Sequence, residues 1–131
     1  MRNSRTVSQR DIKSDRLASA ISLVLTRECI PAERKGYHYL AYAIEEAYMD
    51  REMAGAVSKG LYPAVAKAFS TSPEAVERAI RTAVARGSEI KKAAKEESGE
   101  EITGRKTNSE FIFQAAEQVK MLLDNRTFRI R

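Results

Sequence analysis

Three charged residues, Glu77, Arg78 and Arg81, could read the edges of DNA bases from one side of a predicted helix. An arginine can donate two hydrogen bonds to O6 and N7 of guanine, and a glutamate can accept one from the N4 amine of cytosine. Glu77 and Arg81 are also four residues apart, so an ordinary solvent-exposed ion pair is the alternative interpretation. The choice between the two depends on the elements that hold these residues.

The surrounding segment, Leu61–Gly87, has the pattern of two helices joined by a short turn. The second helix is predicted over about residues 73–86, and Gly87 is expected to end it. Helix-turn-helix proteins use this arrangement to place side chains of the second helix in the major groove of DNA. The apolar residues on the opposite face of that helix are Val76, Ile80, Ala83 and Val84.

The predicted turn contains residues that commonly begin helices. Ser72 precedes Pro73, and proline is best tolerated in the first turn of a helix. Thr71 and Glu74 have the spacing of a capping box, which would start the helix one residue earlier. The register is therefore open by one residue. Because a helix start can bind phosphate, Ser72 is also a candidate contact of the DNA backbone.

Four blocks of the sequence, in order, resemble the DNA-binding effector domain of the stage-zero sporulation response regulator family. The blocks are KGYHYLAYAIEEAY (35–48), SKGLYPAVAKAF (58–69), VERAIR (76–81) and TNSEFI (107–112). The resemblance covers roughly residues 17–123, nearly the whole chain. It implies an all-helical bundle with a helix-turn-helix that binds short promoter boxes with a TGTCGAA-like core.

The resemblance also implies roles for single residues. The VERAIR block carries the family's base-reading residues, and the matching positions here are Glu77, Arg78 and Arg81. The TNSEF block matches a helix start that touches the DNA backbone. The candidate phosphate contacts there are Lys106, Asn108 and Ser109. Independently of the resemblance, Thr107 and Glu110 have the spacing of a capping box, and a helix N-terminus is a natural phosphate site.

The partners that the resemblance implies are double-stranded DNA, the RNA polymerase sigma subunit and a second copy of the chain on tandem boxes.

Two features depart from the family. The 131 residues include no receiver domain with a phosphoacceptor aspartate, so we expect no phosphorelay control within this chain unless it is a piece of a longer protein. The segment after the recognition helix is shorter and has no tryptophan. The family uses that region to engage the sigma subunit, so we expect DNA binding to be better retained than transcriptional activation.

The composition agrees with one folded helical domain that has a polyanionic partner. The formal net charge is +5, the pI is about 9.5 and hydrophobic residues make up 43% of the chain. The single cysteine, Cys29, excludes an internal disulfide, is expected in the core and fits a reducing cytoplasm. With His38 as the only histidine, we expect no metal site, no cofactor and no enzymatic activity. No apolar run is long enough to span a membrane.

The expected fold is all-α, with about six helices in one compact bundle. We expect a polar basic tail, a helix-turn-helix domain and a basic C-terminal end over residues 1–13, 14–125 and 126–131. Ser14 or Asp15 can cap the first helix, and Pro31 is expected to end it. Further helices are expected at about 32–48, 52–61 and 109–123, the last stopped by Asn125, and residues 88–104 are expected to form a marginal exposed helix or a loop.

A protein-interaction module is the alternative function. Such a domain would bind the sigma subunit or antagonise a full-length regulator without reading DNA. The retained trio Glu77, Arg78 and Arg81 favours DNA, because a domain that does not read bases has no physical need for it.

Overall fold

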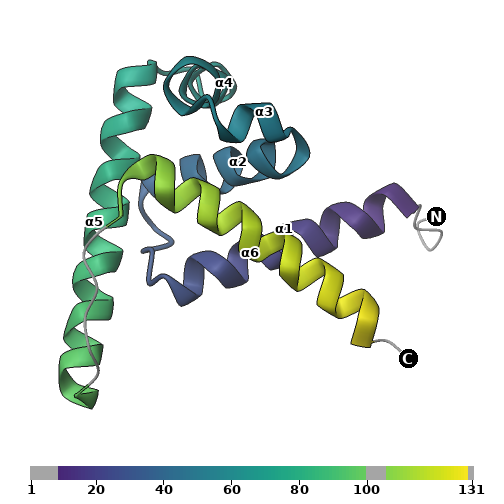
Figure 1. Cartoon of the computed structure of the whole chain (residues 1–131). Helices are drawn as coiled ribbons and strands as arrows, with labels where there is room; N and C mark the ends of the chain where they lie inside the picture. Colours follow the sequence, from purple (N-terminus) through teal and green to yellow (C-terminus); the bar gives the residue numbers. More distant parts are fainter. Residues whose placement is uncertain (1–8, 100–105, 130–131) are drawn as a thin grey trace, which may run out of the picture.

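The computed structural model describes the backbone of residues 9–99 and 106–129 and the side chains of residues 14–99 and 106–124. This part of the chain contains six α-helices, one π-helical turn and no strand, so the predicted all-α class is confirmed. In chain order the elements are α1 (Gln9–Arg27), α2 (Lys35–Met49), α3 (Arg51–Ala54), η1 (Val57–Leu61), α4 (Tyr62–Ala68), α5 (Pro73–Ser98) and α6 (Asn108–Arg129) (Figure 1).

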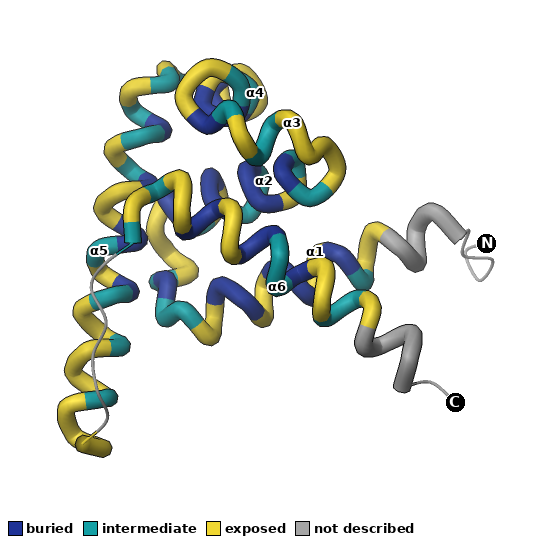
Figure 2. Tube along the Cα trace, viewed as in Figure 1, coloured by how far each residue is buried: buried dark blue, intermediate teal, exposed yellow. Residues whose placement is uncertain are grey.

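Helix α2 is the centre of the bundle, because it contacts every other described element. Its residues Leu40 and Ile44 are fully buried, together with Leu25 of α1, Ile80 of α5 and Ile112 of α6. Figure 2 shows the buried residues gathered where these helices meet, whereas the end of α5 beyond the bundle is largely exposed. The start of α1 and the end of α6 lie on the side opposite α5 (Figure 1).

Helix α1 differs from the prediction at both ends. It begins at Gln9 rather than at Ser14 or Asp15, and it ends at Arg27, before Pro31. Cys29 takes a left-handed conformation with φ 62° and donates its N–H to the carbonyl of Thr26 at 3.0 Å. The N–H of Ile30 reaches back to the carbonyl of Leu25, also at 3.0 Å, which completes a Schellman motif between two buried side chains. Cys29 itself is only half-buried, so its expected place in the core is wrong.

The helices before the helix-turn-helix also differ from expectation. Helix α2 starts at Lys35 rather than at residue 32, because residues 31–34 form a turn in which Arg34 N–H donates to the carbonyl of Pro31. The helix predicted over 52–61 is divided into α3 and η1. Within η1 the N–H groups of Gly60 and Leu61 share one acceptor, the carbonyl of Ala56, at 2.7 and 3.0 Å.

Helix α5 continues well past its predicted end. Gly87 is a buried residue of the helix interior, where α5 crosses the connection between α1 and α2. A Cβ at Gly87 would lie 2.5 Å from the carbonyl oxygen of Glu28 and 2.9 Å from Cδ1 of Ile30, so only glycine permits this approach. The helix ends instead at Gly99, whose φ is +80°. Of the two states predicted for residues 88–98, the exposed helix is confirmed and the loop is wrong, because these residues are helical and mostly exposed; residues 100–105 lie outside the described part.

Helix α6 is also longer than predicted. Its backbone stays helical to Arg129, so Asn125 does not end it and residues 126–129 belong to it. The predictions for residues 1–8 and 130–131 lie outside the described residues.

Candidate nucleic-acid interface

The turn between α4 and α5 is fixed by the backbone of Ser70. Ser70 has φ 56°, and the N–H of Thr71 donates to the carbonyl of Ala66 at 2.9 Å, which is the pattern that ends a helix with a left-handed residue. Ser72 then begins α5, because its Oγ accepts the N–H of Ala75 at 3.1 Å. The open register is resolved in favour of Ser72, and the predicted capping box of Thr71 and Glu74 is not formed.

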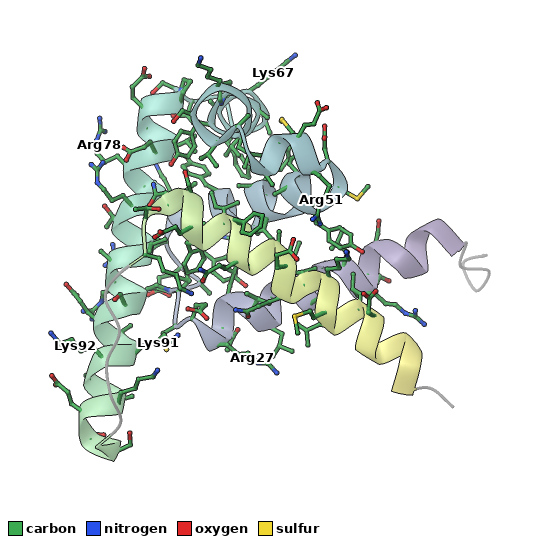
Figure 3. All side chains as sticks on the ribbon, viewed as in Figure 1. Arg27, Arg51, Lys67, Arg78, Lys91 and Lys92 are labelled. Atoms are coloured by element: carbon green, nitrogen blue, oxygen red, sulfur yellow. The ribbon has the colours of Figure 1, made fainter. Side chains whose placement is uncertain are left out.

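The two helices of this motif pack through buried apolar faces, as the sequence predicts. Val65 and Ala66 of α4 are buried, and so are Val76 and Ile80 of α5. This packing leaves the opposite face of α5 free to meet a ligand. Arg78 is exposed on that face, forms no hydrogen bond or ion pair with the described residues and points away from the bundle (Figure 3). Its guanidinium is therefore available for base edges.

Glu77 and Arg81 form the ion pair that the alternative interpretation proposed. Nη1 of Arg81 lies 2.5 Å from Oε2 of Glu77, and the two side chains are 54% and 36% exposed. An exposed pair at this spacing contributes only about 0.3–0.5 kcal/mol, and four of the five guanidinium hydrogens of Arg81 remain available. The pair is thus compatible with base contact.

A groove of about 370 Å³ lies between α4, α5 and the start of α6. It brings together five of the seven predicted contact residues from segments far apart in the sequence: Glu77, Arg81, Lys106, Asn108 and Ser109. Ser72 and Arg78 do not line it; Ser72 is the N-cap of α5, and Arg78 lies in the N-terminal half of the same helix. Lys106 is half-exposed, and its ammonium lies 5.9 Å from the centre of the Phe111 ring.

The predicted capping box at the start of α6 is confirmed. Glu110 N–H donates to Oγ1 of Thr107 at 3.1 Å, and Thr107 N–H donates to Oε1 of Glu110 at 2.9 Å. The backbone N–H groups of Asn108 and Ser109 have no acceptor among the described residues. Such orphan donors at a helix N-terminus are suited to a phosphate.

The side chain of Asn108 is committed to the protein interior. Its Nδ2 donates to Oη of Tyr62 at 2.9 Å and to the carbonyl oxygen of Glu77 at 3.3 Å. Both amide hydrogens are therefore used, and the side chain retains only its oxygen, an acceptor that a phosphate cannot use. The predicted backbone contact at this position can thus come only from the N–H of Asn108.

Tyr62 is a member of this site that the sequence did not single out. The residue is buried, and burial raises the pKa of its hydroxyl; Glu77 raises it further, while the Asn108 hydrogen bond and Arg81 lower it. A buried tyrosine usually needs a partner for its hydroxyl, but nothing in the local sequence indicates which residue supplies it.

Among the side chains that the structure describes, no group of three or more His, Cys, Asp or Glu residues could hold a metal ion. In the same part of the chain, no helix is long and apolar enough to cross a membrane.

A comparison with protein families identifies the chain. The family model described as "Sporulation initiation factor Spo0A C terminal" matches residues 21–119. The match covers well over half of the chain and includes all seven predicted contact residues, so the chain belongs to this family.

Proposed function

We propose that this chain, as a member of the Spo0A C-terminal family, is a transcription regulator that reads a specific box in double-stranded DNA with helix α5. The family supports a DNA-binding effector domain of a sporulation regulator. The main support for base reading by α5 is Arg78, which is exposed and unpaired. It lies on a capped helix whose opposite face packs in the core. The proposed box is the TGTCGAA-like sequence that the resemblance implies.

In this proposal the N-terminal half of α5, about residues 73–86, lies in the major groove. Arg78 and Arg81 donate to O6 and N7 of guanines. Glu77 accepts from the N4 amine of a cytosine or orients Arg81 through the ion pair seen in the free protein. The pairing with Arg81 also keeps the Glu77 carboxylate from being repelled by phosphates.

Backbone contacts on either side of the box would hold α5 in place. The hydroxyl of Ser72 accepts an N–H from its own helix, which leaves its hydrogen to donate to a phosphate. The ammonium of Lys106 and the backbone N–H groups of Asn108 and Ser109 supply the remaining donors at the rim of the groove.

Fluorescence anisotropy with a box duplex and a scrambled duplex, at several salt concentrations, tests the proposal. We expect the wild-type chain to prefer the box by about 10³-fold. Arg78→Ala should cost about 1–3 kcal/mol on the box, a loss of roughly 5- to 150-fold, and little on the scrambled duplex. Arg27→Ala removes the same charge from an exposed side chain at the end of α1, outside the recognition helix and the groove, and is the control. Equal binding of both duplexes by the wild type, or an unchanged preference in Arg78→Ala, would refute the proposal.

A second candidate is the protein-interaction module. Met49 and Phe113 are 69% and 48% exposed and lie beside a hollow of about 620 Å³ between α2, α3 and α6. The partners that the family resemblance implies for the chain are the sigma subunit and a second copy of the chain. Failure to bind either duplex at moderate salt, together with capture of purified sigma subunit, would favour this function over DNA reading.

A further inference from the structure

We propose that Asn108 and Tyr62 are positioning residues, which fix the recognition helix against the start of α6 and thereby set the selectivity of the protein for its box. The inference rests on the proposed function. It assigns to Asn108 a role through α5 in place of a side-chain contact with phosphate.

The proposal rests on the contacts at the junction of α4, α5 and α6, which we define by Tyr62, Glu77 and Asn108. The Asn108 amide joins three elements, because it is the first residue of α6 and donates to Tyr62 of α4 and to Glu77 of α5. The two acceptors are 46 and 31 residues away in the sequence. One side chain therefore ties the first helix of the helix-turn-helix, the recognition helix and the candidate phosphate site together.

The acceptor on α5 is the backbone of a base-reading residue. The carbonyl oxygen of Glu77 has two lone pairs, so it can accept from Asn108 in addition to its bond within the helix. The carbonyl belongs to the residue immediately before Arg78, and any movement at this point moves the Arg78 side chain as well. A base-reading constellation must be held to about 0.5 Å, which loose packing alone does not guarantee.

Tyr62 completes the junction from the other side. Tyr62 is buried and lines the groove from α4, and its hydroxyl oxygen accepts from Asn108 at 2.9 Å. Because the ring is fixed by burial, the hydroxyl offers the Asn108 amide a rigid anchor. The start of α6, and with it the orphan N–H groups of Asn108 and Ser109, is thus held at a set distance from Arg78 and Arg81. A duplex can satisfy the base contacts and the phosphate contact together only if this spacing is kept.

The test compares Asn108→Ala, Tyr62→Phe and the double variant with Gln114→Ala. Gln114 is an exposed amide on the same helix with no contact to the groove, so it is the matched control. We expect Asn108→Ala to lower the ratio of box to scrambled affinity by about tenfold, as the loss of its two hydrogen bonds to Tyr62 and Glu77 can. Affinity for the scrambled duplex and its salt slope should stay at the wild-type values, because no charge at the DNA surface changes. The double variant should be no less selective than Asn108→Ala, since the hydrogen bond that Tyr62→Phe removes is already lost in Asn108→Ala.

Three outcomes would overturn the inference. An equal loss on both duplexes would show that the Asn108 side chain contacts phosphate directly. Unchanged affinities with a lower melting temperature would show that the junction only stabilises the fold. Additive losses in the double variant would show that Tyr62 and Asn108 act separately. Asn108→Leu, which keeps a similar size, removes both donors and adds no charge, replaces the alanine variant should that variant unfold.

A measurement without DNA separates this inference from the proposed function. If the wild type does not prefer the box, the proposed function fails, and the positions of the backbone amides can still be followed by NMR. Asn108→Ala should shift the amide resonances of residues 77–81, whereas Gln114→Ala should leave them in place. Unshifted resonances of α5 in Asn108→Ala would refute the positioning role whatever the DNA result.

Discussion

A single methyl group at Gly36 tests whether α2 sets the position of the recognition helix. Gly36 is buried at the start of α2, where this helix passes closest to α5. A Cβ there would clash with the carbonyl oxygen of Ala79 and lie 2.7 Å from Cβ of Ala83. Real Cβ atoms essentially never come within 3.0 Å of another heavy atom in this way. Because the obstacle is backbone and a methyl group, no rotamer change relieves the overlap. In Gly36→Ala the two helices must separate.

The expected cost follows from two opposed terms. Overpacking in a well-filled core costs about 1–3 kcal/mol. Alanine is the better helix former, which returns up to about 1 kcal/mol. Because Gly36 is only the second residue of α2, little of that gain applies, and Gly36→Ala should lose about 1–2 kcal/mol of unfolding free energy. At about 4 °C per kcal/mol for a chain of this length, the melting temperature should fall by about 4–8 °C.

Thermal and urea unfolding, followed by circular dichroism, measure the loss. Gly55→Ala is the control, because the nearest atom to a Cβ at Gly55 is the carbonyl oxygen of Glu52 at 3.8 Å and the φ of Gly55 is −95°. That variant should be neutral or gain up to about 1 kcal/mol. Since α5 moves, Gly36→Ala should also bind the box duplex less selectively. A Gly36→Ala protein as stable as the wild type would refute the close packing of α2 on α5.

Three further predictions concern the turn, the α6 cap and Tyr62. Ser70→Gly should raise the unfolding free energy by about 0.5 kcal/mol in urea, because a left-handed φ of 56° costs a side chain more than glycine loses in entropy; a less stable variant would contradict this. Thr107→Ala should cost about 1 kcal/mol through the lost N-cap, measured by the melting temperature, and an unchanged value would refute the role of the cap. The raised pKa of Tyr62 means that the folded state holds this proton more tightly, so the contribution is fully present below pH 10.0 and is lost as pH rises through the folded-state pKa. Tyr62→Phe should accordingly lose less stability than the wild type as the pH rises above 10.0, and equal losses would show that Tyr62 does not titrate in this way.

Local signals were sufficient to predict the helix-turn-helix. The residues predicted for the buried face of α5 are Val76, Ile80, Ala83 and Val84, and all four are buried. The hydroxyl and proline at Ser72 and Pro73 also mark the true start of the helix. Periodicity and capping depend on residues within one or two turns, so a single sequence contains the information that they need.

Gly87 shows why the end of α5 could not be predicted in the same way. A glycine can end a helix by adopting positive φ, or it can sit inside a helix where another chain segment comes close. Only the neighbour distinguishes the two, and here the neighbour is the carbonyl of Glu28 in a distant turn. The sequence offers a second glycine, Gly99, that serves as the stop. The side chain of Asn108 could not be placed from the sequence either, since the family resemblance and the local helix start imply a phosphate contact, while its acceptors lie in α4 and α5.

The ion pair of Glu77 and Arg81 does not decide against DNA, because the energies involved are unequal. Breaking an exposed pair at this spacing costs about 0.3–0.5 kcal/mol, and salt in solution lowers that cost further. One bidentate contact between an arginine and a guanine contributes about 1–3 kcal/mol of discrimination. Even a guanine contact that breaks the pair completely therefore repays its loss, whereas a wrong base leaves the pair intact. The pair then lowers the discrimination by no more than its own small cost, since the complex with the correct base alone bears that cost.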